Sequence, residues 1–201
     1  VVTPPYNAFF YFIFCFHILR KRRHNRGIFL LGDECMTAKR LGRQTVALSD
    51  PVSVLSFANI GGKQEARGPL AGYFDELNPD AYFGQKSWEK GESAMQQFAL
   101  SRAMQKGGIT AEEVDCVLAG DLLNQCIGTS FGLRDFKIPF YGLYGACSTM
   151  GESLSLAALL IDGGFASIVA AMTSSHFCTA ERQYRMPVLY GNQRTPTAQW
   201  T

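Results

Sequence analysis

The stretch S-L-S-L-A-A-L-L-I-D-G-G-F-A-S-I-V-A-A-M, residues 153–172, decides the fold class of this chain. Residues 153–161 carry apolar side chains nearly all round a helical period, which predicts a buried helix rather than a surface one. Gly163 and Gly164 end that helix, and residues 165–172 are typical of a buried strand. A helix joined to a buried strand by a short glycine turn is the repeating unit of α/β proteins.

The rest of the chain continues this alternation of strands and helices. Short glycine turns separate the elements, and their order predicts right-handed parallel units, so the predicted fold class is α/β. The other predicted elements are extended segments at 45–48 and 52–60, a helix at 86–106, buried strands at 114–120 and 138–143, and a glycine-weakened helix at 126–134.

Composition restricts the classes of partner. The chain has 201 residues, of which 47% are hydrophobic and 18% charged, which is enough apolar material for one sizeable core. Its formal net charge of +2 is too small to indicate a nucleic-acid partner, and we expect none. The six cysteines form no C-x-x-C pair and no Cys/His spacing typical of a metal site, which indicates a reducing compartment and no structural metal.

The first 35 residues differ in composition from the rest. Residues 8–19 form an apolar run of twelve, and a basic cluster follows at 20–26. A membrane-spanning helix needs about twenty apolar residues, and a signal peptide carries its charges before the apolar run; a short signal-anchor is the remaining membrane alternative. Because no methionine precedes Met36, we expect residues 1–35 to be a non-native upstream or disordered segment outside the fold.

Candidate site residues follow the predicted strands, in segments 121–125, 147–152 and 173–182. In open α/β sheets, ligands bind beyond the carboxyl ends of the strands. Asp121 and Asn124 either bind a ligand or only end their strand and fix the loop. His176 is either a base for a nucleophile or a hydrogen-bonded structural residue, and Arg182 either holds a carboxylate in a bidentate manner or is a surface charge.

Cys147 lies in Y-G-A-C-S-T-M-G-E-S, residues 144–153. Thr149 followed by Glu152 matches the capping-box pattern, which places the helix start two residues beyond the cysteine. The positive end of a helix dipole makes a thiol there a better nucleophile, and the same backbone amides attract a carboxylate ligand. Three roles stay open for Cys147: nucleophile, part of an anion pocket, or small buried residue at a tight junction.

Several motifs, in a consistent order, resemble those of the stage V sporulation protein AD family of spore-forming bacteria. The resemblance covers residues 41–201 and does not reach residues 1–35. The motifs are G-P-L-A-G-Y-F-D (68–75), A-G-D-L-L-N-Q (119–125), G-A-C-S-T (145–149), L-I-D-G-G-F-A (160–166), T-S-S-H (173–176), T-A-E-R-Q-Y-R (179–185) and Y-G-N-Q-R-T-P-T-A-Q (190–199).

That family is similar to thiolases and ketoacyl-carrier-protein synthases, so the resemblance implies a thiolase-like fold. In that fold, two similar βαβαβαββ halves form an α-β-α-β-α layered core. The resemblance implies that residues 36–201 are the N-terminal half of such a domain, apparently truncated, because another strand and a second half are expected after Q-W-T. Cys147 matches the nucleophilic cysteine of those enzymes by position.

The function implied by the resemblance is non-catalytic binding of dipicolinic acid, in a complex with other membrane proteins that moves calcium dipicolinate into the developing spore. It further implies no cofactor, a peripheral position at the cytoplasmic face of a membrane without a transmembrane segment, and a homodimer as one option. The ligand residues would come from Asp121, Asn124, Cys147, Ser148, Thr149, His176 and Arg182. The alternative is an acyltransferase that loads Cys147 from a coenzyme A thioester.

Overall fold

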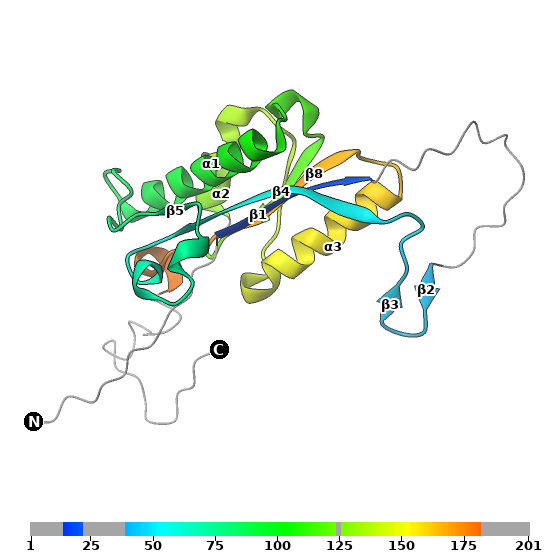
Figure 1. Ribbon diagram of the computed structural model, residues 1–201, viewed down its shortest axis with the longest axis horizontal. Helices are drawn as coiled ribbons and strands as arrows, with labels where there is room; N and C mark the ends of the chain where they lie inside the picture. The colour runs from blue at the N-terminus through cyan, green and yellow to red at the C-terminus, as the bar shows by residue number, and fades with distance from the viewer. Residues whose placement is uncertain (1–13, 22–38, 124–125, 182–201) are drawn as a thin grey trace, which may run out of the picture.

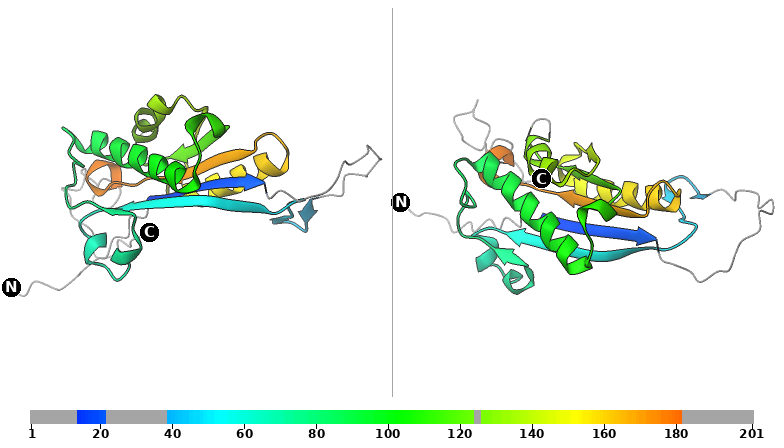
Figure 2. Two further views of the ribbon diagram at one scale, coloured as in Figure 1. Left: turned by 45° about the horizontal axis from the view of Figure 1, so that its top comes forward. Right: turned by 90° about the horizontal axis from the view of Figure 1, so that it is seen from above.

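The computed structural model describes residues 14–21, 39–123 and 126–181, which form a six-stranded sheet with helices on both faces. The elements of this body, in chain order, are β1 (Phe14–Lys21), β4 (Val52–Gly61), β5 (Glu76–Leu77), α1 (Trp88–Gly107), β6 (Cys116–Gly120), α2 (Ile127–Leu133), β7 (Phe140–Gly142), α3 (Thr149–Asp162) and β8 (Ile168–Thr173). Helices α1 and α2 lie on one face of the sheet and α3 lies on the other (Figures 1 and 2). The predicted α/β class is confirmed.

The strands are ordered β5-β4-β1-β8-β6-β7 across the sheet. Strand β6 is parallel to β7 and β8, and β4 is parallel to β5, as the alternation of strands and helices predicted. Strand β1 is antiparallel to both of its neighbours, β4 and β8. Because β4 and β8 both oppose β1, the carboxyl ends of every strand of this sheet other than β1 lie at one edge.

The position of β1 differs from the expectation that residues 1–35 stay outside the fold. Strand Phe14–Lys21 lies inside the sheet, where Ile18 and Leu19 are buried in the apolar clusters on its two faces. An apolar run that is too short to span a membrane is long enough for a strand, since strands usually have about 3–10 residues. A continuous apolar run, without alternation, is typical of a strand that is covered on both faces.

Two apolar clusters hold the helices to the sheet. Successive side chains of β8 point to opposite faces, so Ala170 and Met172 pack in the cluster that contains α1, whereas Val169 and Ala171 pack in the cluster that contains α3. The α1 cluster includes Met95, Ala99, Leu100, Ala103 and Met104, and the α3 cluster includes Ala157 and Ile161. Burial on both faces explains why β6 and β8 have continuous apolar sequences.

Helix α1 begins at Trp88, two residues after the predicted start at 86, and ends at the predicted glycine pair. The Ser87 side chain accepts a hydrogen bond from the amide of Lys90, and Gly108 adopts a left-handed conformation with φ 63° directly after the last turn. Helix α3 also begins at the predicted position, Thr149, but the predicted capping box is absent. Ser148 occupies the position before the helix, and its hydroxyl donates to the carbonyl oxygen of Gly145 instead.

Helix α3 is only half buried, which corrects the prediction of a helix buried all round. Ala157 and Ile161 are fully buried against the sheet, but Leu156 is 37% exposed and Leu159 is 44% exposed on the opposite side. The described residues therefore cover only one side of α3, although its sequence is apolar nearly all round.

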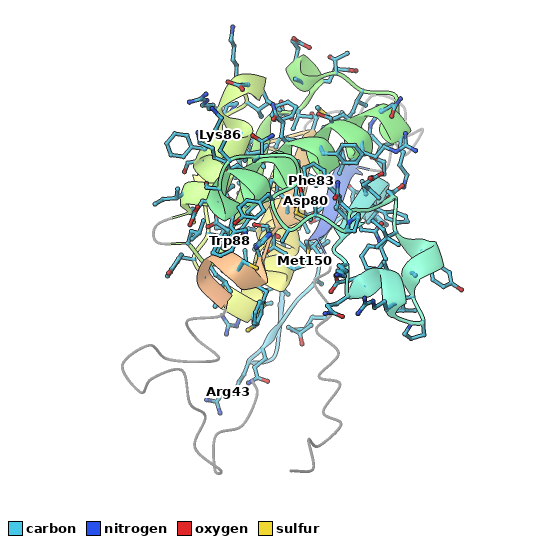
Figure 3. All side chains as sticks on the ribbon, turned by 90° about the vertical axis from the view of Figure 1, so that its left-hand side faces the viewer. Arg43, Asp80, Phe83, Lys86, Trp88 and Met150 are labelled. Carbon is cyan, nitrogen blue, oxygen red and sulfur yellow. The ribbon has the colours of Figure 1, made fainter. Side chains whose placement is uncertain are left out.

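A small hairpin lies apart from the main sheet. It pairs β2 (Arg40–Leu41) with β3 (Thr45–Val46), so the extended segment predicted at 45–48 does not join the six-stranded sheet. Figure 3 shows Arg43 at the tip of this hairpin, well away from the helices. Asp162 at the end of α3 anchors its base, because Asp162 pairs with Lys39 at 2.6 Å and accepts a hydrogen bond from the Ser49 amide at 2.8 Å.

Candidate functional site

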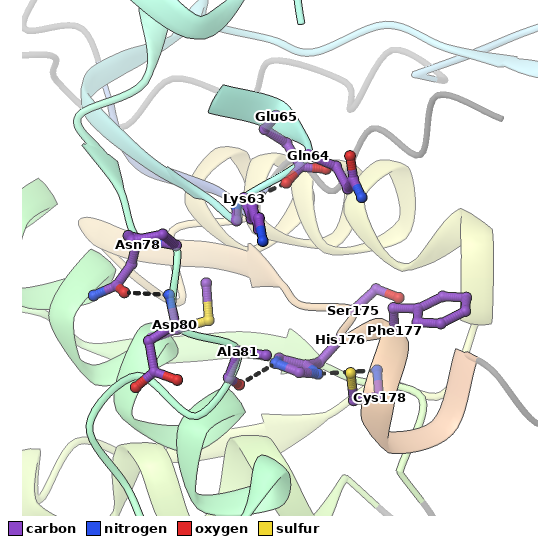
Figure 4. Close-up of a pocket in the computed structure, with 13 residues that line it drawn as sticks. Lys63, Gln64, Glu65, Asn78, Asp80, Ala81, Ser175, His176, Phe177 and Cys178 are labelled. Atoms are coloured by element: carbon purple, nitrogen blue, oxygen red, sulfur yellow. Dashed lines mark hydrogen bonds between the residues drawn. The ribbon is translucent and has the colours of Figure 1, made fainter. Parts of the chain in front are cut away.

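A cavity of about 410 Å³ lies at the carboxyl edge of the sheet (Figure 4). Residues 62–65 after β4, residues 78–81 after β5 and residues 175–178 after β8 form its wall, together with Met95 of α1. Small-molecule sites usually enclose about 300–1,000 Å³ and are found beyond the carboxyl ends of strands in such sheets. The cavity therefore has the size and the position of a small-molecule site.

His176 is a fixed part of the cavity wall. Its side chain is buried, its Nε2 atom lies 2.8 Å from the carbonyl oxygen of Ala81, and its Nδ1 atom accepts a hydrogen bond from the amide of Cys178. These partners assign the proton to Nε2. Burial lowers the pKa of His176, and the hydrogen bond to Ala81 opposes this effect only in part, so the ring is neutral near pH 7.

Charged residues line the cavity from two of its loops. The carboxylate of Glu65 is buried and accepts a hydrogen bond from the amide of Gly62 at 2.8 Å. The carboxylate of Asp80 accepts from the amides of Gly84 and Tyr82, which hold its pKa below the usual value. In Figure 4, Lys63 points from its loop toward the side of the cavity formed by Ala81 and His176. Lys63 therefore supplies the wall with an ammonium group.

A buried polar cluster lies directly behind this wall. Glu92 and Gln96 of α1 are each 1% exposed, and they contact Ser174 and Thr179. Burial raises the pKa of Glu92 from 4.5 to about 7, and the hydrogen bonds from Ser174 and Thr179 oppose this effect only in part. Glu92 is therefore a buried carboxyl group behind the α1 side of the cavity, with a pKa of about 7.

Sequence reasoning did not single out Glu92, although a signal for it exists. Glu92 lies three and seven residues before Met95 and Ala99, so it falls on the same helical face as those two core residues. A carboxyl group on the apolar face of a predicted helix indicates either a special environment or a functional role.

Asp121 is buried at the end of β6, where its carboxylate serves as a local structural acceptor. Its Oδ1 atom accepts from the amide of Leu123 at 2.9 Å, and its Oδ2 atom accepts from the amide of Thr129 at 2.7 Å and from the Thr129 hydroxyl. These bonds fix the connection from β6 to α2, which matches the loop-fixing alternative that the sequence left open. Asn124 and Arg182 lie outside the described residues.

Cys147 and its neighbours lie at the same edge of the sheet, after β7. Cys147 and Ser148 are exposed in a short 3-10 turn, η5 (Ala146–Ser148), and Thr149 is buried as the first residue of α3. Of the residues predicted for the site and described by the structure, only His176 lines the cavity. The ligand roles of Asp121, Cys147, Ser148 and Thr149 therefore stay predictions.

The cavity also uses residues outside the predicted site segments, such as Lys63 and Asp80. Gly61 and Gly62 end β4 at the carboxyl edge of the sheet. This glycine pair is the sequence signal that could have predicted the loop at 62–65 as part of the site. Across the described ranges, no three His, Cys, Asp or Glu side chains lie close enough together to hold a metal ion. No helix within those ranges has the length and apolar character needed to cross a membrane.

Comparison with known proteins assigns the chain to a family. Residues 42–201 match the family described as Stage V sporulation protein AD (SpoVAD). A curated relative, Stage V sporulation protein AD of Bacillus subtilis (strain 168), is 43% identical over 160 residues, which cover 80% of this chain and 47% of the relative. The chain thus spans about half the length of that relative, and its match begins after β1. The chain belongs to the stage V sporulation protein AD family.

Proposed function

We propose that the chain is a non-catalytic component of the machinery that moves dipicolinic acid into the developing spore, and that it binds this ligand in the cavity beside His176. The family name supports a role in sporulation. The observation that carries the proposal of a binding role is the cavity of about 410 Å³ at the carboxyl edge of the sheet, with an ammonium group and a neutral imidazole on its wall.

The chemistry of this wall suits a flat aromatic dicarboxylate. Pyridine-2,6-dicarboxylate requires a cation for its carboxylates and an apolar or aromatic surface for its ring. Lys63 supplies the cation, and Met95 and Phe177 supply apolar surface. The carboxylates of Glu65 and Asp80 are bonded to backbone amides of their own loops, which moderates their repulsion of an anionic ligand.

The state of His176 favours binding over catalysis. Both ring nitrogens have backbone partners, Ala81 and Cys178, so the ring already uses the two atoms with which a catalytic base accepts and transfers protons. Cys147 is not among the residues that line the cavity with His176. A histidine held in this way orients the cavity wall, and we propose that role for it.

The remaining parts of the proposal concern the surroundings of the protein. We propose a peripheral position at the cytoplasmic face of a membrane of the developing spore, together with other membrane proteins of the same uptake complex. A homodimer is compatible with this arrangement. We propose no cofactor, because dipicolinic acid is the ligand rather than a reagent.

Calorimetry with dipicolinate tests the binding role. Wild-type chain is expected to bind dipicolinate, whereas Lys63→Glu is expected to lose at least tenfold in affinity because it replaces the ammonium of the cavity wall with a carboxylate. Lys90→Glu is the matched control, since Lys90 is an exposed lysine of α1 outside the cavity wall. Each titration is repeated with equimolar calcium chloride, which distinguishes the free dianion from the calcium complex as the ligand. Absence of binding in both conditions would refute the proposal.

The second candidate function is acyl transfer, and the exposure of Cys147 two residues before the start of α3 favours it. In that case the thiolate attacks the thioester carbonyl of an acyl-coenzyme A, the acyl group moves to sulfur, and coenzyme A leaves as its thiolate, which takes up the proton that Cys147 released. Intact-mass measurement after incubation with acetyl-coenzyme A separates the two functions. A stoichiometric acetyl adduct that is lost in Cys147→Ser would establish acyl transfer and contradict the non-catalytic role.

A further inference from the structure

The cluster behind the cavity wall joins α1 to the single π-helical turn that forms one side of the cavity, η6 (Phe177–Glu181). Thr179 of this turn lies between Glu92 on α1 and the carbonyl oxygen of His176. Phe177 and Cys178 of the same turn line the cavity. The hydrogen bonds of Thr179 therefore fix the position of a part of the wall.

Thr179 has one hydroxyl proton and two close oxygen partners. Its Oγ1 atom lies 2.8 Å from Oε2 of Glu92 and 2.8 Å from the carbonyl oxygen of His176. If Glu92 is ionised, both partners are acceptors and one of the two contacts lacks a proton. If Glu92 carries a proton on Oε2, it donates to Thr179, and Thr179 donates to His176. Only the neutral acid makes both contacts hydrogen bonds.

The other contacts of Glu92 agree with a neutral acid. The Ser174 hydroxyl donates to Oε1 of Glu92 at 2.7 Å and accepts from the side-chain amide of Gln96. The hydroxyl protons of Ser174 and Thr179 and the acid proton of Glu92 are then each used once. Among the described residues, Oε1 of Gln96 is the buried side-chain polar atom left without a hydrogen-bond partner. If Glu92 were ionised, either its Oε2 atom or the carbonyl oxygen of His176 would also lack the Thr179 proton, which would leave two unsatisfied acceptors in the same cluster.

We propose that Glu92 is a proton-dependent latch on the ligand cavity: as the neutral acid it holds η6 against α1, and its ionisation releases this turn and weakens ligand binding. The inference rests on the proposed function, because it concerns access to the same cavity. The movement of η6 itself is measurable without any ligand.

The charged groups around Glu92 favour its neutral form. Asp121, which follows β6, and Glu89, on the preceding turn of α1, are carboxylates that raise the pKa of Glu92 further. His176, which precedes η6, is neutral near pH 7 because burial lowers its pKa. Helix α2 has no titratable side chain in its sequence. Ionisation of Glu92 near neutral pH thus places a buried negative charge near other carboxylates. Opening of η6 lets water solvate this charge and so lowers its free-energy cost.

Amide hydrogen exchange on the 201-residue chain measures the latch directly. We expect the amides of η6 to lose at least tenfold in protection between pH 6 and pH 8.5, after correction for intrinsic exchange, because the protonated fraction falls about tenfold for each pH unit above the pKa. Glu92→Gln is expected to keep its protection at both pH values, since the glutamine amide donates to Thr179 and its oxygen accepts from Ser174.

Two variants of Thr179 provide a second test that leaves Glu92 in place. Thr179→Ser retains the hydroxyl and is expected to behave as wild type. Thr179→Val removes it and is expected to give low protection of η6 at both pH values. Calorimetry under the same conditions should show the affinity of wild type for dipicolinate falling at least tenfold from pH 6 to pH 8.5, with no such change in Glu92→Gln.

The outcomes separate the latch from the proposed function. Equal protection of η6 at both pH values in wild type overturns the latch, whether or not dipicolinate binds. A change in protection that persists in Glu92→Gln assigns the titration to another group and also overturns it. A change in protection that is lost in Glu92→Gln, with no binding of dipicolinate at either pH, supports the latch and overturns the proposed function.

Discussion

Replacing Glu92 by glutamine is expected to remove a pH-dependent part of the free energy of unfolding. Burial raises the pKa of Glu92 from 4.5 to about 7 in the folded chain. Between these values the folded chain binds a proton that the unfolded chain has released, so the free energy of unfolding falls as pH rises and is level again above about pH 7. At roughly 1.4 kcal/mol for each pKa unit, the full effect is about 3 kcal/mol.

Urea unfolding followed by tryptophan fluorescence, at pH values from 5 to 8, measures this effect. The free energy of unfolding of Glu92→Gln relative to wild type is expected to increase by about 2 to 3 kcal/mol over that range, because glutamine does not ionise. Groups that titrate in both proteins, such as His176, cancel in the difference. Glu152→Gln, which changes an exposed residue of α3 that does not affect the pKa of Glu92, is the control and should give a nearly constant difference. A constant difference for Glu92→Gln would refute the reasoning.

Two further substitutions test the fold around the site. Gly120→Ala is expected to cost at least about 3 kcal/mol or to prevent folding, because an added Cβ would lie 1.9 Å from a backbone carbonyl oxygen after β7. Urea unfolding measures the cost, and Gly151→Ala, where a Cβ meets no atom within 4 Å, should be neutral or stabilising by up to about 1 kcal/mol. Asp162→Asn weakens the anchor of Lys39, so trypsin is expected to cleave at the hairpin, for example after Arg43, several-fold faster than in wild type. Equal cleavage rates would show that the ion pair does not hold the hairpin.

Much of the fold could be predicted because its central strands are covered on both faces. Strands β6 and β8 are continuous apolar sequences between glycine turns, and α1 has a serine cap and a terminal glycine, so each has a local signal. Strand β1 lacked such a signal. A run of apolar aromatic residues fits a strand, a signal-anchor or a core segment equally well, and only its partners across the sheet decide among them.

The candidate site could be predicted only where it follows strands with clear signals. His176 was found because it follows β8, a strand that the sequence marks well. The loop that contains Asp80 follows β5, which has only two residues and joins the sheet through β4. Such a short strand has no periodicity of its own, so no pattern in the sequence predicted that Asp80 would lie near His176. The hydroxyl partners of Glu92, Ser174 and Thr179, are more than 80 residues away in the sequence, so only the folded chain shows that they meet.

The position of β1 has a consequence for how this sheet is completed. Strands β4 and β8 are not adjacent in the sheet, and β1 connects them through antiparallel pairing on both sides. The family match begins at residue 42, so the matched region supplies two separate parts of a sheet, β5–β4 and β8–β6–β7, with a slot one strand wide between them. A strand in this slot pairs through its main chain on both sides and is covered on both faces, so it must run antiparallel to β4 and β8 and carry apolar side chains. In this structure residues 14–21 fill that slot, so the two parts belong to one sheet only through the main-chain pairing of β1 with β4 and β8.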